Sequence, residues 1–214
     1  MPKKFFKVEL VPALRRLEIL SKGLTSSRLI GAYRSVFKGK GLEFAGYRGY
    51  TMADDASLID WKASSRTNEI LIKEYAEERE VDVFFLIDCS ERMLFGSTDK
   101  LKAEYVIELT ASLTHAILEA GDSVGLSLYS DKVKSDILPS RGKTQFYTIS
   151  KMLLNPEYYQ GNNFDLKGAV KFIFNYLKKS AVIIIISDFL SWKDDWEESL
   201  ELLTTKFDVI CIMV

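Results

Sequence analysis

The stretch Val81-Asp82-Val83-Phe84-Phe85-Leu86-Ile87-Asp88-Cys89-Ser90 decides the fold of this chain. Its first seven residues are apolar except Asp82, which is typical of a strand covered by helices on both faces. The apolar run then ends in a carboxylate and a hydroxyl, Asp88 and Ser90. Because ligands bind outside the carboxyl ends of the strands in open α/β sheets, the same stretch marks the first candidate site.

Helix and strand patterns alternate after this first strand. Residues 123–129 and 133–138 predict two strands joined by a short polar turn, and therefore a hairpin with one antiparallel edge strand. The remaining predicted elements are helices over 101–117, 144–154, 166–179 and 196–203, with Gly121 as a stop signal, and strands over 181–186 and 209–214. We therefore predict a doubly wound, mostly parallel α/β sheet. Because the sequence ends inside the last predicted strand, we expect a C-terminally truncated form with an uncovered sheet edge.

A different pattern precedes residue 81. A stripe of leucines over residues 10–24 predicts an amphipathic helix, and glycines among aromatic residues over 37–50 predict a small β element. Another short strand is predicted at 70–72. We place the domain boundary near Glu80, so that residues 1–80 form an N-terminal helix and small β appendage and residues 81–214 form the α/β domain.

Composition excludes several classes of protein. The chain has 214 residues, of which 47% are hydrophobic and 28% charged, as in ordinary globular proteins. Its apolar runs are far shorter than the roughly 20 residues of a transmembrane helix, and its first residues do not resemble a signal peptide. Cys89 and Cys211 are both expected in or beside buried strands, and two scattered cysteines do not make a disulfide framework. We expect a cytoplasmic protein.

Charge is unevenly distributed along the chain. Residues 1–40 carry ten Lys or Arg and two Glu, a net +8, which leaves −9 for the rest of a chain whose net charge is −1. This basic segment is either an arm for nucleic acid, an anionic membrane surface or an acidic partner, or an amphipathic helix packed on the chain's own acidic body. We favour the second interpretation because the leucine stripe must be buried.

Two apolar strands end in the same way, since Ser187-Asp188 follows Ile186 as Asp88 follows Ile87. If the two strands are neighbours, Asp88, Ser90 and Asp188 form a set of oxygen ligands suited to a hard cation such as Mg²⁺.

This pattern of Asp-x-Ser and a later Ser-Asp resembles the metal-ion-dependent adhesion site of von Willebrand factor A domains. A longer ordered series of matches is similar to the MoxR-associated bacterial family known as domain of unknown function 58. The matching segments are Gly41-Leu42-Glu43-Phe44, Arg48-Gly49-Tyr50, Asp54-Asp55, residues 59–67, Lys73-Glu74-Tyr75, Glu78-Arg79, Phe95-Gly96, residues 121–126 and Arg141-Gly142.

The resemblance implies a von Willebrand factor A-like fold and a non-catalytic, protein-binding adaptor. Its implied partners are a MoxR-type AAA+ ATPase and the client proteins that the pair assembles or activates. It implies no enzymatic activity, no nucleic acid and no small-molecule substrate.

The chain departs from the adhesion-site pattern at two places. Arg92 stands where the pattern has its second serine, and the expected threonine loop corresponds to residues 161–165, which contain no threonine. A guanidinium at this position neutralises the carboxylates and repels a cation. We therefore expect a degenerate site. Either Mg²⁺ binds there, or Asp88 and Asp188 are capped and paired for structural reasons alone, and we favour the second interpretation. If the site is a docking point, Arg92, Asn163 and Asp165 are the expected protein-binding residues.

A second polar cluster lies before the domain boundary. Its members are Asp54, Asp55, Asp60, Trp61, Lys62 and Arg66. The cluster is either a contact surface for a partner or an interdomain clasp between the β appendage and the main sheet. We favour the clasp because Arg and Asp in fork geometry around a tryptophan suit an interface.

The main enzymatic alternative is a Mg²⁺-dependent phosphatase of the haloacid-dehalogenase kind with Asp88 as nucleophile. That chemistry needs a second Asp two residues later as the proton donor, and Ser90 occupies that position. A Cys89 nucleophile is disfavoured because the single histidine, His115, lies in the middle of an apolar helix pattern. The sequence has no glycine-rich phosphate loop.

Overall fold

The structure is a computed structural model that describes residues 43–51, 54–67, 69–76, 81–96, 100–161, 163–190, 192 and 196–214. The helix predicted at residues 10–24, and the basic segment that contains it, lie outside the described residues. The described residues fall into two compact units, one over residues 43–76 and one over residues 81–214.

The larger unit contains a five-stranded sheet with the order β5-β4-β3-β6-β7. Its strands are β3 (Asp82–Asp88), β4 (Ser123–Tyr129), β5 (Val133–Ser140), β6 (Val182–Ser187) and β7 (Asp208–Met213). All pairings are parallel except that of β5 with β4, which is the predicted hairpin. The doubly wound, mostly parallel sheet with one antiparallel edge strand is therefore confirmed.

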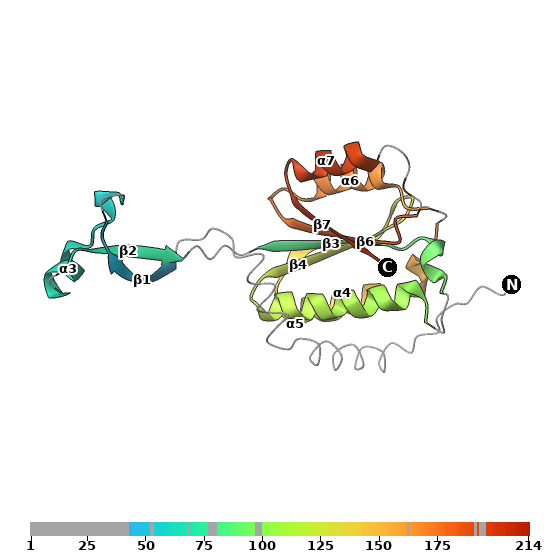
Figure 1. The fold of residues 1–214 in the computed structure, drawn as a ribbon. Coiled ribbons are helices and arrows are strands. Elements are labelled where there is room, and N and C mark those ends of the chain that lie inside the picture. Colours follow the sequence, from blue (N-terminus) through green and yellow to red (C-terminus); the bar gives the residue numbers. More distant parts are fainter. Residues whose placement is uncertain are drawn as a thin grey trace. The chain divides into compact units, whose positions relative to one another are not determined.

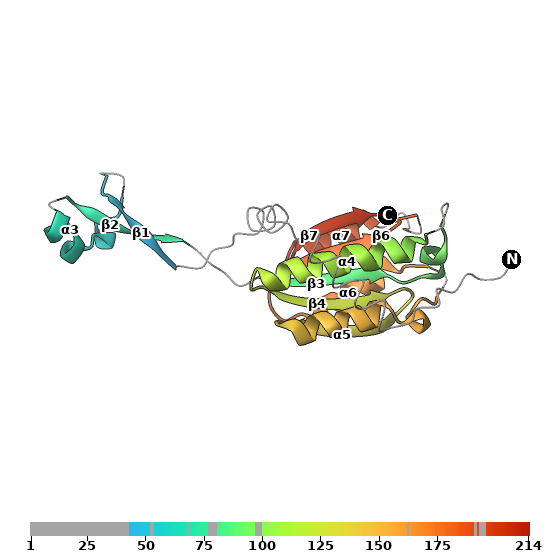
Figure 2. The ribbon, with the colours of Figure 1, turned by 90° about the horizontal axis from the view of Figure 1, so that it is seen from below.

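Helices cover both faces of this sheet, with α4 and α5 on one face and α6 and α7 on the other (Figure 1). They span α4 (Lys102–Glu119), α5 (Lys143–Leu153), α6 (Leu166–Tyr176) and α7 (Trp196–Thr204), and the short 3₁₀ helices are η2 (Glu91–Leu94) and η3 (Pro156–Tyr158). Figure 2 looks onto the face that α4 and α5 cover. After α4 the chain turns at Gly121, whose φ of 92° is readily adopted only by glycine, as the stop signal predicted.

The core explains why the central strand is apolar throughout. Every residue from Val83 to Ile87 is 0% exposed. Alternate residues Phe84 and Leu86 belong to the cluster that also contains Ile183 and Ile185 of β6 and apolar residues of α6 and α7. Since side chains alternate across a strand, Val83, Phe85 and Ile87 point to the opposite face, which α4 and α5 cover.

The smaller unit is an antiparallel hairpin with two short helices. Strands β1 (Glu43–Gly49) and β2 (Leu71–Ala76) pair with an irregularity between Phe44 and Gly46, and η1 (Ala56–Leu58) and α3 (Trp61–Thr67) lie between them in sequence. The α3 helix is not among the elements that the sequence pattern predicts. Its start has a physical cause, since Oδ1 of Asp60 accepts hydrogen bonds from the backbone of Lys62 and Ala63 at 3.0 Å each.

The cysteines differ from each other in their surroundings. Cys89 is fully buried, as expected, whereas the expectation that Cys211 is buried is wrong, because Cys211 is exposed. Cys211 lies on β7, which has one neighbouring strand, β6, among the described residues. Within the described part of the chain, no helix combines the length and apolarity needed to cross a bilayer.

Candidate functional site

The carboxyl ends of β3 and β6 lie side by side. Ile87 is opposite Ile186 in the parallel pairing, so Asp88 is level with Ser187, and Asp188 lies one residue beyond. By alternation, Asp88 and Ser187 continue the face of Phe84 and Ile185, which α6 and α7 cover. Asp188 is out of phase with them and meets α4 on the other face. The two carboxylates are therefore neighbours in the sheet but have different partners.

Asp88 is held in a closed hydrogen-bond network. Its side chain is buried, with Oδ2 accepting from the hydroxyl of Ser187 at 2.7 Å and Oδ1 accepting from the backbone N–H of Ser90 at 2.9 Å. Burial raises the pKa of Asp88, the hydrogen bonds from Ser187 and Ser90 oppose that rise, and the charge of Asp188 adds to it. Asp88 therefore accepts hydrogen bonds that connect Ser90, in the loop after β3, with Ser187 at the end of β6.

Asp188 is an ionised carboxylate with two cationic partners. It is 3% exposed, and its Oδ2 lies 2.9 Å from Nζ of Lys102 and 3.7 Å from Nε of Arg92. Its Oδ1 accepts from the backbone N–H of Leu190 at 3.1 Å. Burial alone would raise the pKa of Asp188, but the hydrogen bonds from Lys102 and Leu190 and the charges of both cations outweigh it and lower that pKa.

Lys102 is the functional residue that sequence reasoning missed. It is the first residue of α4, where a positive charge is opposed by the helix dipole by about 0.3–1 kcal/mol. The one available signal was a lysine at the start of a helix that was expected to pack beside the strand ends. In the structure the ion pair with Asp188 offsets this cost.

The turn after β6 is strained. Phe189 has a φ of 54°, in the left-handed region that a bulky side chain rarely adopts. Its backbone N–H donates to the hydroxyl oxygen of Ser187 at 3.1 Å, and Ser187 in turn donates to Asp88. One hydroxyl thus links the Asp88 network to the turn that carries Asp188. Such strain is maintained only where the surroundings hold the backbone in place.

The loop that precedes α6 contains the predicted residues Asn163 and Asp165, both exposed. Asp165 caps α6, since its Oδ1 accepts from the backbone of Gly168 at 3.2 Å. This loop is joined to the segment after β3 by the backbone N–H of Glu91, which donates to the carbonyl of Gly161 at 2.9 Å. The structure therefore brings this loop beside η2. Asp165 accepts hydrogen bonds from its own helix and donates its backbone N–H to the carbonyl of Ser130.

A divalent cation does not fit the predicted metal ligands as they are arranged. Oδ2 of Asp188 is bonded to an ammonium, and both oxygens of Asp88 accept hydrogen bonds from the protein itself. Ser90 Oγ is buried and makes no hydrogen bond of standard geometry among the described residues, although it lies close enough to Asp88 to lower the pKa of that carboxyl. Within the same residues, no group of three or more His, Cys, Asp or Glu side chains could hold a metal ion. A metal would first have to displace Lys102.

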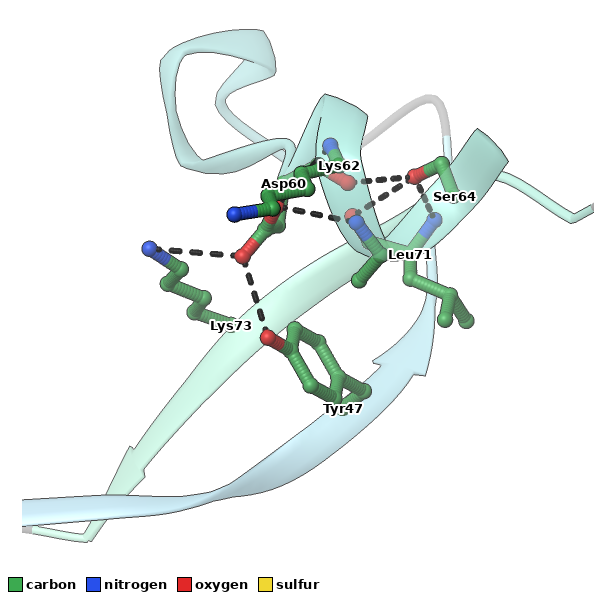
Figure 3. A network of polar contacts seen from close by, with 7 residues as sticks. Tyr47, Asp60, Lys62, Ser64, Leu71 and Lys73 are labelled. Carbon is green, nitrogen blue, oxygen red and sulfur yellow. Dashed lines mark hydrogen bonds and ion pairs between the residues drawn. The ribbon is translucent and has the colours of Figure 1, made fainter. Parts of the chain in front are cut away.

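Asp60, one member of the polar cluster, is the centre of a hydrogen-bond network in the smaller unit (Figure 3). Its Oδ2 accepts from the hydroxyl of Tyr47 at 3.0 Å and lies 3.4 Å from Nζ of Lys73. The backbone N–H of Ala63 is the main cause of a lowered pKa at Asp60. Burial opposes it as the next largest influence, and the hydrogen bonds from Tyr47 and Lys73 add to the lowering. Asp60 thereby fixes α3 on the hairpin.

Asp54 is paired in fork geometry with the guanidinium of Arg48, at 2.8 and 2.7 Å. That pairing, followed by the hydroxyl and backbone of Thr51, lowers the pKa of Asp54. Asp55 caps η1 by accepting from the backbone of Ser57 at 2.9 Å.

The other members of the cluster, Trp61, Lys62 and Arg66, are exposed, and Trp61 is 69% exposed. The hydrogen bonds and ion pairs described for this cluster lie within residues 47–73. Its role as an interdomain clasp stays a prediction.

Comparisons with known proteins agree with this picture. A family described as "Protein of unknown function DUF58" matches residues 46–214. A structure of conserved hypothetical protein BatB from Bacteroides thetaiotaomicron is similar in fold, with a TM-score of 0.51 at 16% identity, over 62% of this chain and 66% of that one. The von Willebrand factor A-like α/β fold is confirmed by this architecture.

Two curated relatives are uncharacterised proteins. Rv1480 from Mycobacterium tuberculosis is 24% identical over 207 residues, which is 96% of this chain and 65% of the relative. YeaD from Bacillus subtilis is 31% identical over 83 residues, which is 39% of this chain and 19% of the relative. The chain thus spans about two thirds of the length of the first and a smaller share of the second.

Proposed function

The chain belongs to the DUF58 family of proteins of unknown function, and we propose that it acts in the cytoplasm as a non-catalytic adaptor that binds other proteins. Its proposed partner is a MoxR-type AAA+ ATPase, together with the client proteins on which the two act. The resemblance to the family supports the ATPase and its clients as partners. The geometry of the site supports a docking face there.

One observation carries this proposal: the acidic groups at the strand ends are already engaged by donors of the chain itself. Asp88 is bonded to Ser187 and to the backbone of Ser90, and Asp188 is bonded to Lys102. A nucleophile or general base needs a lone pair directed at a substrate, and these carboxylates direct theirs at the protein. Such a site favours recognition over catalysis.

The environment of Cys89, next to Asp88, also argues against a catalytic nucleophile. Cys89 is fully buried, and burial, together with the charge of Asp88, raises its pKa far above the usual range. His115 packs edge-on against Phe146 of α5, with ring centres 5.7 Å apart. A reactive thiolate needs the opposite environment, exposed and electropositive.

The surface beside the site has the composition of a docking face. Phe95 and Leu190 are 68% and 69% exposed, which is unusual for large apolar side chains. Phe95 accepts a backbone hydrogen bond from Lys102, and Leu190 donates one to Asp188, so both are anchored to the charged group. Exposed apolar side chains around a few fixed charges are typical of protein interfaces.

Binding of the purified chain to the MoxR-type ATPase of the same organism tests this proposal. Biolayer interferometry should give saturable binding that a Phe95→Ser, Leu190→Ser double variant weakens by about tenfold or more, equivalent to about 1.4 kcal/mol. Leu202→Ser on α7 is the matched control, since Leu202 is a comparably exposed leucine at 52%. Equal loss in the control, or no binding at all, contradicts the proposal.

An activity assay separates the proposal from the phosphatase alternative. With p-nitrophenyl phosphate and Mg²⁺ we expect no turnover above that of an Asp88→Asn variant. Turnover that disappears in Asp88→Asn would establish an enzyme instead.

A further inference from the structure

The cation of the strand-end site belongs to the chain itself. Lys102 approaches from α4 and places Nζ 2.9 Å from Oδ2 of Asp188, a distance typical of a charge-assisted hydrogen bond. Arg92 approaches from η2, with Nε 3.7 Å from the same oxygen. Two positive groups therefore converge on one buried oxygen atom.

The position of Lys102 indicates a specific role. A lysine in the first turn of a helix is disfavoured by the helix dipole, and the same turn ordinarily carries acidic residues. The Lys102 side chain is 25% exposed and that of Arg92 is 40% exposed, whereas that of Asp188 is 2% exposed. The carboxylate is thus enclosed by the protein, while both cations keep a solvent-facing part.

We propose that Lys102 takes the place of a metal ion at this site, and that Lys102 and Arg92 together bind a carboxylate of an acidic partner segment directly, without a divalent cation. The inference rests on the proposed protein-binding function and names the chemistry that the docking face recognises.

Charge complementarity supports a carboxylate as the occupant. Two cations, Lys102 and Arg92, face the carboxylate of Asp188, and both keep a solvent-exposed part. The exposed apolar residues Phe95 and Leu190 are joined to Lys102 and Asp188 by hydrogen bonds. A guanidinium and an ammonium are donors only, so they recognise acceptors such as a carboxylate. A glutamate or aspartate flanked by apolar side chains matches both parts of this surface.

Titration with Mn²⁺ tests the replacement of the metal. In the ¹⁵N-labelled full chain, paramagnetic broadening of the Ser90 and Leu190 amides should be no greater than that of exposed amides elsewhere in the chain. The variant Lys102→Ser removes the ammonium and adds an oxygen, and it should show selective broadening at these amides at about millimolar Mn²⁺. Selective broadening in the unaltered chain that Asp188→Asn abolishes would overturn the proposal.

Titration with acetate tests the carboxylate site. Saturable shifts of the Arg92 and Leu190 amides should occur with sodium acetate, exceed those with sodium chloride at equal ionic strength, and persist in EDTA. Lys102→Met should weaken acetate binding by about tenfold, and Lys102→Arg, which keeps the charge, should restore most of it. Lys134→Met is the matched control, because Lys134 forms a 2.8 Å ion pair with Asp131 on the β4–β5 hairpin. Shifts identical in acetate and chloride would refute the carboxylate site.

The two proposals fail separately. If ATPase binding requires Mg²⁺ and is abolished by EDTA, the chain is an adaptor but the metal-free mechanism is wrong. If acetate binds as expected while the ATPase and its clients do not, the site stands and the adaptor function falls. Circular dichroism of each variant shows whether it is folded. If Lys102→Met does not fold, acetate binding by Lys102→Arg tests whether the positive charge is required.

Discussion

The ion pair between Lys102 and Asp188 can be measured with a double-mutant cycle of Lys102→Met and Asp188→Asn. Methionine keeps the apolar stem of the lysine, and asparagine keeps the shape of the aspartate, so each change mainly removes a charge. The free energy of unfolding of the two single variants and the double variant then isolates the coupling between these two residues.

The structure sets the expected size of this coupling. Two unit charges 4 Å apart attract by about 4 kcal/mol at an effective dielectric constant of 20, and desolvation of the enclosed Asp188 offsets much of that. The Lys102 side chain is 25% exposed, and Arg92 stays within 3.7 Å of the same oxygen, so Asp188 is not left alone in Lys102→Met. We therefore expect a coupling of about 1–2 kcal/mol, below the 3–5 kcal/mol lost when a fully buried pair is broken.

Urea denaturation followed by circular dichroism measures these free energies, and thermal melts should show Lys102→Met lower by about 2–8 °C. The pair of Lys134 and Asp131 is the control, because its contact distance is similar at 2.8 Å but the Asp131 side chain is 58% exposed. Its coupling should be about 0.5 kcal/mol or less. Equal couplings for the two pairs would refute the argument that enclosure of Asp188 makes its ion pair strong.

Three further predictions concern the surroundings of the site and the smaller unit. The raised pKa of Asp88 favours its protonated form in the folded state, so its stabilising contribution is present below its usual pKa of 3.8 and is lost as pH rises through the folded pKa. Urea titrations should therefore show Asp88→Asn gaining stability relative to the unaltered chain from about pH 4 upward, and a constant difference would contradict this sign. Gly161→Ala should lower the free energy of unfolding by about 1–3 kcal/mol, because φ at Gly161 is 110° and the new Cβ would lie 2.6 Å from Ser130 Oγ. Gly121→Ala, where φ is 92° and no atom lies near the new Cβ, should lower it by about 1 kcal/mol in the same assay. Asp60→Ala should speed hydrogen exchange of the α3 amides by removing about 1–2 kcal/mol of capping and hairpin contacts, and faster exchange in Asp55→Ala than in Asp60→Ala would contradict the central place of Asp60.

The sequence alone was sufficient for the architecture of the larger unit. Strands β3 and β6 are apolar runs that end in polar residues, a polar turn separates β4 from β5, and each helix repeats its apolar residues on one face, so the local pattern and the final structure agree. The predicted hairpin and the parallel strands follow from the same signals. The α3 helix was missed because its seven residues have one buried member, Ser64, and so lack an apolar stripe.

The sequence also determined which strand ends carry Asp88 and Asp188, because an apolar strand that stops at a carboxylate is a local feature. Only the tertiary structure decided what each carboxylate binds. The parallel register of β3 and β6 sets Asp88 beside Ser187 and leaves Asp188 out of phase, facing α4. Lys102 is 86 residues from Asp188 in the chain, and no local pattern encodes a contact across that separation. Packing of α4 against the sheet creates this contact. The ammonium of Lys102 thereby lies where a metal site would have a cation.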